Sequence, residues 1–216
     1  MIMQPGKKKH RRYTWKQLFM DLARIVCVPL LLVCRMKRIT PTGEPYKGKI
    51  YGGAILAANH TGFFDTFLVG IAVWYRRMFF LAAEIVMQGK LRNWLLRGVG
   101  AIEIDRNQAD IEAIRKSVDV LKEGNLLLIF PQGGISEENQ IQTLKSGAVL
   151  IALQAGVPIV PMHIRPREHW YSRRTVVIGQ TLDPKAYIQK KFPSTADIDR
   201  VSQKLAEEMN RCAAHQ

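Results

Sequence analysis

The sequence is poor in cysteine, and this shortage excludes two classes of protein. Its 216 residues include three cysteines (Cys27, Cys34 and Cys212), an odd and widely spaced set without a Cys-x-x-Cys pair. Such a set argues against a disulfide framework and against structural zinc, and it fits a reducing compartment. No Gly/Ser/Pro-rich linker, repeat or low-complexity segment divides the chain, and 47% of it is hydrophobic. We therefore expect one sizeable core.

Acidic residues are also scarce. The chain has 32 Lys and Arg against 18 Asp and Glu, a formal net charge of +14. This balance predicts an anionic partner, either nucleic acid or a membrane surface. Within residues 1–38, ten basic residues face a single acidic one, Asp21. Most of the excess charge therefore belongs to the N-terminal segment.

The same segment contains an apolar run that no simple targeting signal explains. The run from Leu18 to Cys34 has 17 residues and includes Asp21, Arg24 and Pro29, whereas a spanning helix needs about 20 cleaner ones. A signal peptide would need a small-residue cleavage site, which is absent. A nucleic-acid arm would not use the apolar run, and a core helix with a basic tail is a further alternative.

We interpret this segment as an interfacial membrane anchor. Tyr13 and Trp15 would lie at headgroup level, the apolar run would enter the acyl boundary, and the flanking Lys and Arg would meet anionic lipid. Pro29 would divide the run into two short helices. The expected organisation is a basic tail with anchor helices over residues 1–40 and a globular domain over residues 41–216.

From about residue 49, apolar strand patterns alternate with helical ones. The middle strands are continuously apolar, which is typical of strands covered on both faces. This alternation predicts an α/β fold with a central, mostly parallel sheet covered by helices. The expected strands are KIYGGAILAAN, MFFLAAE, AIEID, NLLLIF, PIVPMHI and RTVVIGQ, and the expected helices are DTFLVGIAVWYRR, NWLLRGVG, ADIEAIRKSVDVLKEG, TLKSGAVLIALQAG and a last helix capped by Ser194.

Functional sites in such sheets form where strands end and loops lead into helices. The stretch NHTGFFD occupies one such position, with His60 at a strand end and Asp65 opening the next helix. The turn would bring the carboxylate back to the imidazole, fix its tautomer and leave the other nitrogen as a general base. Alternatively, Asp65 is a helix cap and His60 an ordinary turn residue. Asn59 also begins an Asn-x-Thr glycosylation pattern. We do not expect it to carry a glycan, because glycosylated asparagines lie on exposed loops, whereas Asn59 lies at a strand end beside a predicted site.

No protein nucleophile stands out, since there is no G-x-S-x-G elbow and no cysteine beside a base. A histidine base then suits direct attack by a substrate hydroxyl. The pair Gly133 and Gly134 in FPQGG would offer backbone N–H groups to an oxyanion or phosphate. Arg106 and Lys145 would supply cations, although both positions also suit solvated surface charges.

Five blocks in this order resemble the glycerolipid acyltransferases of the lysophosphatidate-acyltransferase type. They are NHTGFFD (59–65), GAIEIDR (100–106), FPQGGIS (130–136), KSGAVLIA (145–152) and VPIVPMHI (157–164). The resemblance covers about residues 50–182 and makes residues 41–216 an acyltransferase domain. It implies transfer of a fatty acyl group from acyl-CoA or acyl carrier protein to a lysophospholipid, with 1-acylglycerol-3-phosphate favoured, in phospholipid biosynthesis. Metal ions and cofactors are not expected.

The resemblance also implies roles for individual residues. His60 would be the general base and Asp65 its orienting partner. Arg106 would hold the acceptor's phosphate, and Pro161 would flank the acyl pocket. The implied substrate-binding residues are Arg106, Gln132, Gly133, Gly134, Lys145 and Pro161. The chain would act at the cytoplasmic face of the membrane, with the lipid bilayer, the lysolipid and the acyl donor as partners and no nucleic acid.

The third block departs from the family pattern F-P-E-G-T-R-S. Gln132, Gly134 and Ile135 stand where the family has Glu, Thr and Arg. Loss of that arginine leaves two alternatives for the acceptor. It is either 1-acylglycerol-3-phosphate, held by Arg106 and Lys145, or a less anionic lipid such as another lysolipid, a glycolipid or a lipid alcohol. A non-catalytic lipid-binding relative is a further alternative.

Overall fold

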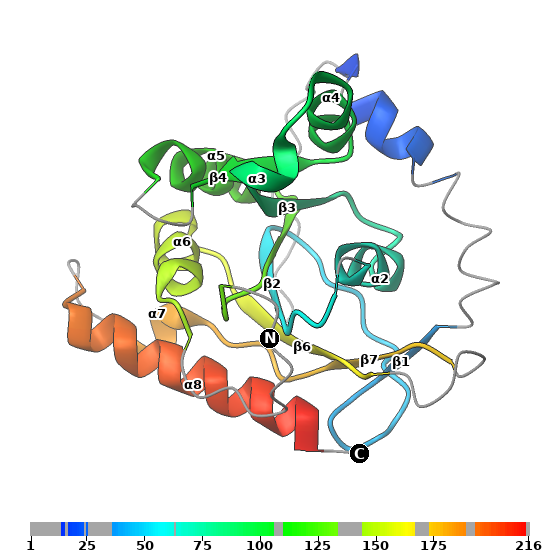
Figure 1. Ribbon diagram of the computed structural model, residues 1–216. Helices are drawn as coiled ribbons and strands as arrows, with labels where there is room; N and C mark the ends of the chain where they lie inside the picture. The colour runs from blue at the N-terminus through cyan, green and yellow to red at the C-terminus, as the bar shows by residue number, and fades with distance from the viewer. Residues whose placement is uncertain are drawn as a thin grey trace.

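The computed structural model describes residues 14–15, 17–23, 25, 36–62, 64–105, 110–133, 144–166, 173–188 and 193–214. Seven strands in this part of the chain form one sheet with the order β1-β7-β6-β2-β5-β3-β4 (Figure 1). All neighbouring pairs are parallel except β6 and β7, which are antiparallel. The strands are β1 (Lys37–Ile39), β2 (Ala54–Ala58), β3 (Met78–Ala83), β4 (Ala101–Ile104), β5 (Leu126–Ile129), β6 (Ile159–Ile164) and β7 (Thr175–Ile178).

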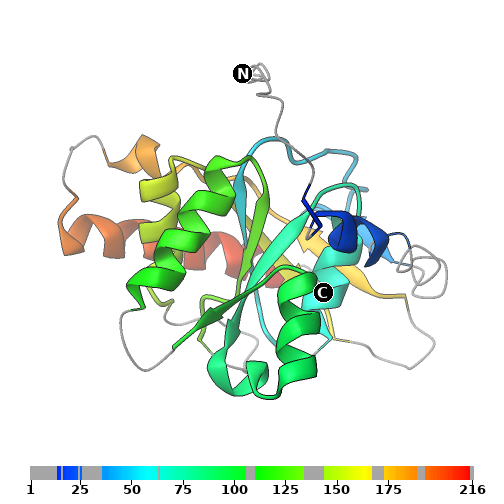
Figure 2. The same ribbon diagram turned by 90° about the horizontal axis from the view of Figure 1, so that it is seen from above.

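Helices cover both faces of this sheet, as Figures 1 and 2 show from two directions. One core lies between the sheet and α5, α6 and α8, and a second lies between the sheet and α2. The helices are α2 (Asp65–Ala72), α3 (Glu84–Met87), α4 (Lys90–Gly98), α5 (Ile111–Lys122), α6 (Gly147–Ala155), α7 (Pro184–Tyr187) and α8 (Thr195–Ala214). The predicted α/β class and mostly parallel sheet are confirmed.

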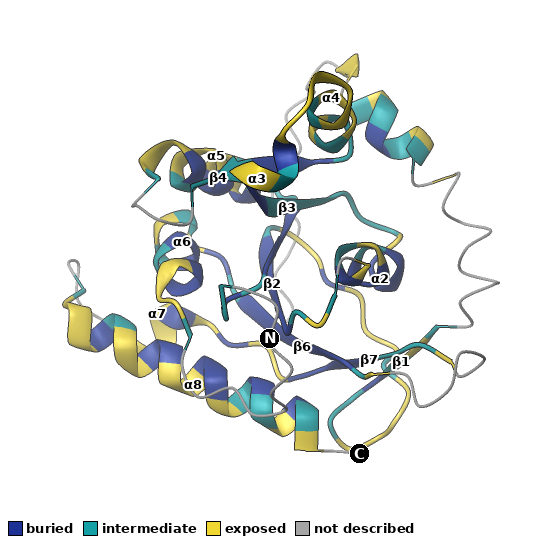
Figure 3. Cartoon of the chain, in the orientation of Figure 1, coloured by how far each residue is buried: buried dark blue, intermediate teal, exposed yellow. Residues whose placement is uncertain are grey.

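The centre of the sheet is the most deeply buried part of the molecule (Figure 3). Every residue of β2 is buried, and so is every residue of β5. Because both strands are apolar on both faces, they fit only between two layers of helix. The continuous apolar runs AILAA and LLLI therefore explain why the sheet is covered on both sides.

The N-terminal helix, of which Trp15, residues 17–23 and Ile25 are described, packs on the body of the molecule. Asp21 accepts two hydrogen bonds from the Arg77 guanidinium, at 2.6 Å and 3.0 Å. In the sequence, Asp21 interrupts an apolar run. In the structure, its charge is paired with that of Arg77. In the part of the chain that is described, no helix combines the length and apolar character needed to cross a membrane.

Three short elements were not predicted. The strand β1 pairs with β7, so residues 37–39 belong to the sheet although they precede the expected boundary at residue 40. The helices α3 and α7 have four residues each, too few for a recognisable hydrophobic period. Tyr13, Arg24 and Pro29, which the anchor interpretation used, lie outside the described residues.

Candidate active site

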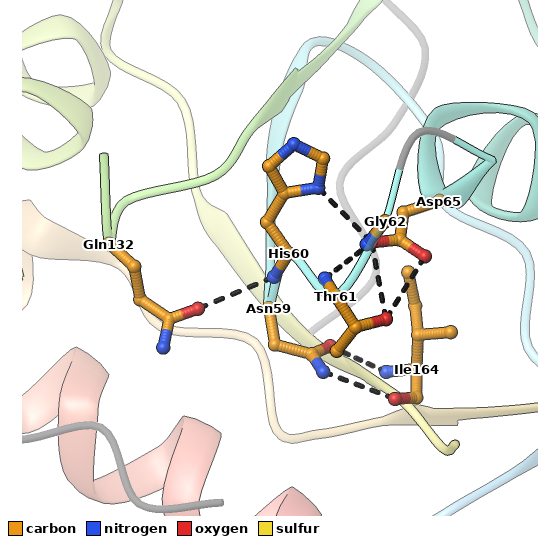
Figure 4. Close-up of polar contacts among 7 residues, drawn as sticks. All are labelled: Asn59, His60, Thr61, Gly62, Asp65, Gln132 and Ile164. Atoms are coloured by element: carbon orange, nitrogen blue, oxygen red, sulfur yellow. Dashed lines mark hydrogen bonds and ion pairs between the residues drawn. The ribbon is translucent and has the colours of Figure 1, made fainter. Parts of the chain in front are cut away.

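The turn after β2 brings Asp65 back to His60, as the sequence predicts (Figure 4). Oδ2 of Asp65 lies 3.1 Å from His60 Nδ1. The same oxygen accepts the backbone N–H groups of Thr61 at 2.6 Å and Gly62 at 2.7 Å. The Thr61 hydroxyl donates to Oδ1 at 3.3 Å. Asp65 is thus held by the turn that carries the histidine.

The alternative that Asp65 is only a helix cap is not supported. The N-cap position of α2 is Phe64, and no side chain caps this helix. Asp65 accepts N–H groups that precede the helix rather than those of its first turn. Its side chain therefore serves the histidine turn and not the end of α2.

Asp65 is charged where it stands. It is 4% exposed, and this burial by itself raises its pKa, but the hydrogen bonds from His60, Gly62 and Thr61 outweigh burial and hold the pKa of Asp65 below its ordinary value. An ionised carboxylate accepts from His60 Nδ1–H, which places the ring proton on Nδ1. His60 Nε2, which points away from Asp65 in Figure 4, is left to take a proton.

Two residues of the third block hold His60 from the other side. Its imidazole stacks on the Phe130 ring, with 4.1 Å between centroids and 13° between planes. Its backbone N–H donates to Gln132 Oε1 at 3.3 Å. These contacts fix the plane of the ring and the position of its backbone, so the imidazole is oriented before any substrate binds.

The pairing of β2 with β5 explains why these blocks meet. Ala57 is level with Ile129 in this parallel register. His60 and Gln132 each lie three residues beyond this aligned pair, in the loops that follow the two strands, and the hydrogen bond between them joins these loops. The two apolar strands therefore align the first and third sequence blocks at one edge of the sheet.

Asn59 fixes the start of the turn to the other neighbouring strand. Its amide oxygen accepts the Ile164 N–H at 2.7 Å, and its amide nitrogen donates to the Ile164 carbonyl at 3.1 Å. The side chain is buried, with 6% exposed. The Asn-x-Thr pattern is therefore a structural clamp in this fold and offers no accessible amide for a glycan.

A lysine ammonium lies beside the glycine turn of the third block. Gly133 has φ +77°, and a Cβ there would meet Lys145 Cε at 2.6 Å and Nζ at 3.2 Å. The Lys145 backbone N–H donates to the Pro131 carbonyl at 2.8 Å, which ties this segment to the turn. Gly133 is needed both for the left-handed backbone and for the space that Lys145 fills.

Of the remaining predicted site residues, only Pro161 lies in the part of the chain that the structure describes. Pro161 lies within β6, level with Ala57, about 10 Å below His60 at the usual rise per residue. Its ring lies beside Gly179 on the α8 side of the sheet. Arg106 and Gly134 lie outside the described residues, as does Ile135.

Sequence reasoning missed Phe130 as a support of the histidine ring and Asn59 as a clamp. The position of Phe130 directly after β5 gave a signal, because the register that aligns Gln132 with His60 also brings Phe130 to the same end of β2. The link from Asn59 to Ile164 joins residues 105 apart in sequence, so no local pattern could reveal it.

A mostly parallel α/β sheet with a His-x4-Asp pair at its carboxyl edge defines the class of this protein. A family model described as Acyltransferase matches residues 37–165. The chain therefore belongs to this acyltransferase family, and the resemblance found in its sequence blocks is confirmed.

The chain is similar to proteins that acylate lysolipids. It is 30% identical over 109 residues to a 1-acyl-sn-glycerol-3-phosphate acyltransferase of Bacillus subtilis (strain 168), which covers 50% of this chain and 54% of that one. It is 26% identical over 147 residues to a lyso-ornithine lipid O-acyltransferase of Rhodobacter capsulatus, covering 68% of this chain and 49% of that one. The chain thus spans about half the length of these relatives.

The fold also matches a solved structure. The 1-acyl-sn-glycerophosphate (LPA) acyltransferase PlsC from Thermotoga maritima superposes with a TM-score of 0.59 over 94% of this chain and 82% of that chain. At 17% sequence identity this likeness shows the fold alone.

Proposed function

We propose that this protein is an O-acyltransferase that moves a fatty acyl group from a thioester to the hydroxyl of a lysolipid. The observation that carries the proposal is the His60 ring, oriented by Asp65 and stacked on Phe130, with Nε2 directed away from Asp65 (Figure 4). A base held in this way at the carboxyl edge of an α/β sheet suits proton removal from a substrate hydroxyl.

The reaction proceeds without a protein nucleophile. Nε2 of His60 takes the proton of the acceptor hydroxyl as its oxygen attacks the thioester carbonyl. The imidazolium that forms is stabilised by the Asp65 carboxylate. When the tetrahedral intermediate collapses, the C–S bond breaks and the thiolate takes the proton from His60. The products are an ester and a free thiol, so His60 is again neutral.

The donor is a thioester of coenzyme A or of acyl carrier protein, and the proposed chemistry requires no metal or resident cofactor. The Gly133 N–H donates to the Phe130 carbonyl at 3.1 Å and closes the turn, so it is not the donor for a developing oxyanion. Lys145 reaches this turn with its ammonium and suits an anionic group of the acceptor as a point charge. Arg106 would add a second cation, and Gly134 would keep the turn open.

The acceptor we favour is 1-acylglycerol-3-phosphate, the substrate named for several relatives. A second candidate is a less anionic lysolipid, because relatives named lyso-ornithine lipid O-acyltransferases also match and because Ile135 replaces the family's arginine. Gln132 keeps the hydrogen bond to His60 without a negative charge, so it is compatible with both acceptors.

The reaction is proposed to occur at the cytoplasmic face of a membrane. Lysolipids reside in bilayers, and the N-terminal helix exposes Trp15 and Leu18 next to a sequence rich in Lys and Arg. Such a segment suits the boundary between headgroups and acyl chains.

A direct test incubates the full chain with labelled acyl-CoA, or acyl carrier protein charged with the same acyl group, and three lysolipids in vesicles. The three are 1-acylglycerol-3-phosphate, lyso-ornithine lipid and uncharged monoacylglycerol, and the products are identified by mass spectrometry. His60→Ala is expected to lower transfer by about 10³-fold or more while the circular dichroism spectrum stays unchanged.

The acceptor choice is tested with Lys145→Ala. This variant is expected to raise KM about tenfold or more for the phosphate acceptor, consistent with the loss of one charge-assisted contact, and to leave transfer to monoacylglycerol unchanged. A His60→Ala variant that transfers at the wild-type rate would refute the assigned base. Absence of transfer to any lysolipid from either donor would favour the non-catalytic lipid-binding alternative.

A further inference from the structure

The helix α4 is an unusual surface element, because none of its residues is fully buried. Figure 3 shows it exposed over most of its length, at the end of the sheet farthest from β1. Leu91 is 71% exposed, Trp94 62% and Leu95 43%, and the neighbouring Ile85 of α3 is 70% exposed. We call these four residues the α4 face.

The three residues from α4 share one side of the helix. Leu91, Trp94 and Leu95 are spaced i, i+3 and i+4, which places their side chains together. Leu96 instead packs against the small core formed with β3 and β4. The helix is therefore anchored by Leu96 while large apolar side chains are presented to the outside, which is the pattern of an interaction surface rather than of scattered exposed residues.

The α4 face is continuous with the N-terminal helix. The rings of Phe19 and Trp94 meet edge to face, with 5.4 Å between centroids and 63° between planes. Gly98 permits this approach, because a Cβ there would lie 2.6 Å from the Phe19 ring. A groove of about 950 Å³ runs between the two helices, with Trp15, Leu18, Phe19 and Trp94 in its lining. The two helices are neighbours in Figure 1, and their apolar side chains line the same groove.

Lys90 and Arg92 make the start of α4 positive, whereas Arg97 is paired with Glu103 and Glu84 is an acidic neighbour of Ile85. The sequence of α4, KLRNWLLRG, contains three cations and no acidic residue. Lys90 and Arg92 lie at the start of the helix beside Leu91 and Leu95. A second copy of the chain related by two-fold symmetry would bring these cations against their own equivalents. Anionic lipid headgroups complement them, and tryptophan with leucine suits the layer just beneath.

The α4 face begins at the same edge of the sheet as the proposed base His60. The strands β2, β5, β3 and β4 are parallel, so they end at one edge of the sheet. His60 follows β2 at this edge, and α3 begins directly after β3, two strands away. This separation is about 10 Å at the usual strand spacing. A membrane in contact with the α4 face would therefore lie beside the edge that carries His60.

We propose that the α4 face is a bilayer-docking surface that inserts into the headgroup–acyl boundary of an anionic membrane. It is a second membrane contact in addition to the N-terminal segment. This proposal adds to the proposed function and can fail independently of it, because membrane binding is measured without turnover.

The experiment compares the full-length wild type with the double variant Ile85→Asn/Leu91→Asn. Binding is measured by co-sedimentation with vesicles of phosphatidylcholine and phosphatidylglycerol at a 3:1 ratio. Because two exposed apolar side chains lose their insertion, we expect binding to weaken about tenfold or more. Transfer to a water-soluble short-chain lysolipid should stay within twofold, and transfer to a vesicle-embedded lysolipid should fall with binding.

The matched control is Ile111→Asn. Ile111 is 78% exposed at the start of α5, which covers the opposite face of the sheet (Figure 2), and its replacement is expected to change vesicle binding less than twofold. A second variant, Lys90→Glu/Arg92→Glu, should weaken binding to the anionic vesicles and leave the weak binding to pure phosphatidylcholine unchanged.

Three results would overturn the proposal. The first is unchanged vesicle binding by both double variants. The second is that the double variants lose transfer from acyl carrier protein but keep transfer from acyl-CoA and keep vesicle binding. This result would make the α4 face a docking surface for the carrier protein. The third is that the variants form a smaller assembly in solution than the wild type, which would make the α4 face an interface between copies of the chain. His60→Ala should bind vesicles like the wild type, so a failure of the proposed chemistry is distinguished from a failure of docking.

Discussion

Replacing Asp65 by asparagine keeps the shape of the side chain and removes its charge, so it isolates the electrostatic part of the proposed base. An amide oxygen in the place of Oδ2 can still accept the N–H groups of Thr61 and Gly62. The amide nitrogen then faces the Thr61 hydroxyl, which can accept a hydrogen bond. The turn should therefore persist, while the imidazolium of His60 loses its counter-charge.

The size of the effect follows from the distance. His60 Nδ1 and Asp65 Oδ2 are 3.1 Å apart, so the centres of the two charges are about 4 Å apart, and at an effective dielectric constant of about 20 their attraction is about 4 kcal/mol. Since about 1.4 kcal/mol changes a rate tenfold, kcat of Asp65→Asn should fall by about 10²- to 10³-fold. Loss of hydrogen bonds to a charged acceptor should lower the free energy of unfolding by about 1–3 kcal/mol.

The assay follows release of free thiol from acyl-CoA and measures kcat and KM separately, with stability taken from urea unfolding. The control is Asp197→Asn, a similarly buried carboxylate that accepts the Ser194 hydroxyl at 2.7 Å at the start of α8. This control should lose about 1 kcal/mol of stability and keep kcat within twofold. If Asp65→Asn retained a tenth or more of kcat, or if both variants lost kcat equally, the orienting role of Asp65 would be refuted.

Burial, with a contribution from Arg165, lowers the pKa of His163 to about 4. Between pH 6.5 and 4, His163 is therefore protonated in the unfolded chain and neutral in the folded chain. The free energy of unfolding should therefore fall by about 3 kcal/mol across this window, and His163→Gln should flatten that slope in urea titrations at several pH values. Gln132→Glu can still accept the His60 N–H and should keep kcat within about tenfold, whereas Gln132→Leu should lose more than the glutamate variant; equal rates for both would contradict a positioning role. Gly98→Ala adds a methyl group where the Phe19 ring lies, so the N-terminal helix should detach from α4, and hydrogen exchange of residues 17–23 should accelerate while the remainder of the chain is unchanged.

Much of the fold could be predicted because its elements follow simple periods. AILAA and LLLI are apolar at every position and form the buried strands β2 and β5. The helix α5 buries Val118 and Leu121 as its apolar spacing predicts, but Ile111, which the same spacing placed on the buried face, is 78% exposed and Ala113 is buried instead. The strand β1 was missed, because three residues within a basic segment carry no period and acquire their place only by pairing with β7.

The pairing of His60 with Asp65 could also be predicted, because it is local and spans a single turn. Its supports could not. The hydrogen bond from His60 to Gln132 joins residues 72 apart, and it depends on a register that only the assembled sheet defines. The FPQGG motif indicated a phosphate or oxyanion loop, whereas the structure adds that its first and third residues, Phe130 and Gln132, hold the base in place.

The clamp of Asn59 onto β6 has a consequence for the use of binding energy. With Asn59 tied to Ile164, Asp65 tied to the turn and Phe130 beneath the ring, the proposed base is assembled in the free protein. In the proposed reaction, an arriving lipid has no histidine to reorganise, so none of its intrinsic affinity is consumed in ordering one. The contacts that the lipid makes along its length remain available for aligning its hydroxyl with the thioester. Differences in rate between acceptors should therefore reflect how each lipid lies in the site.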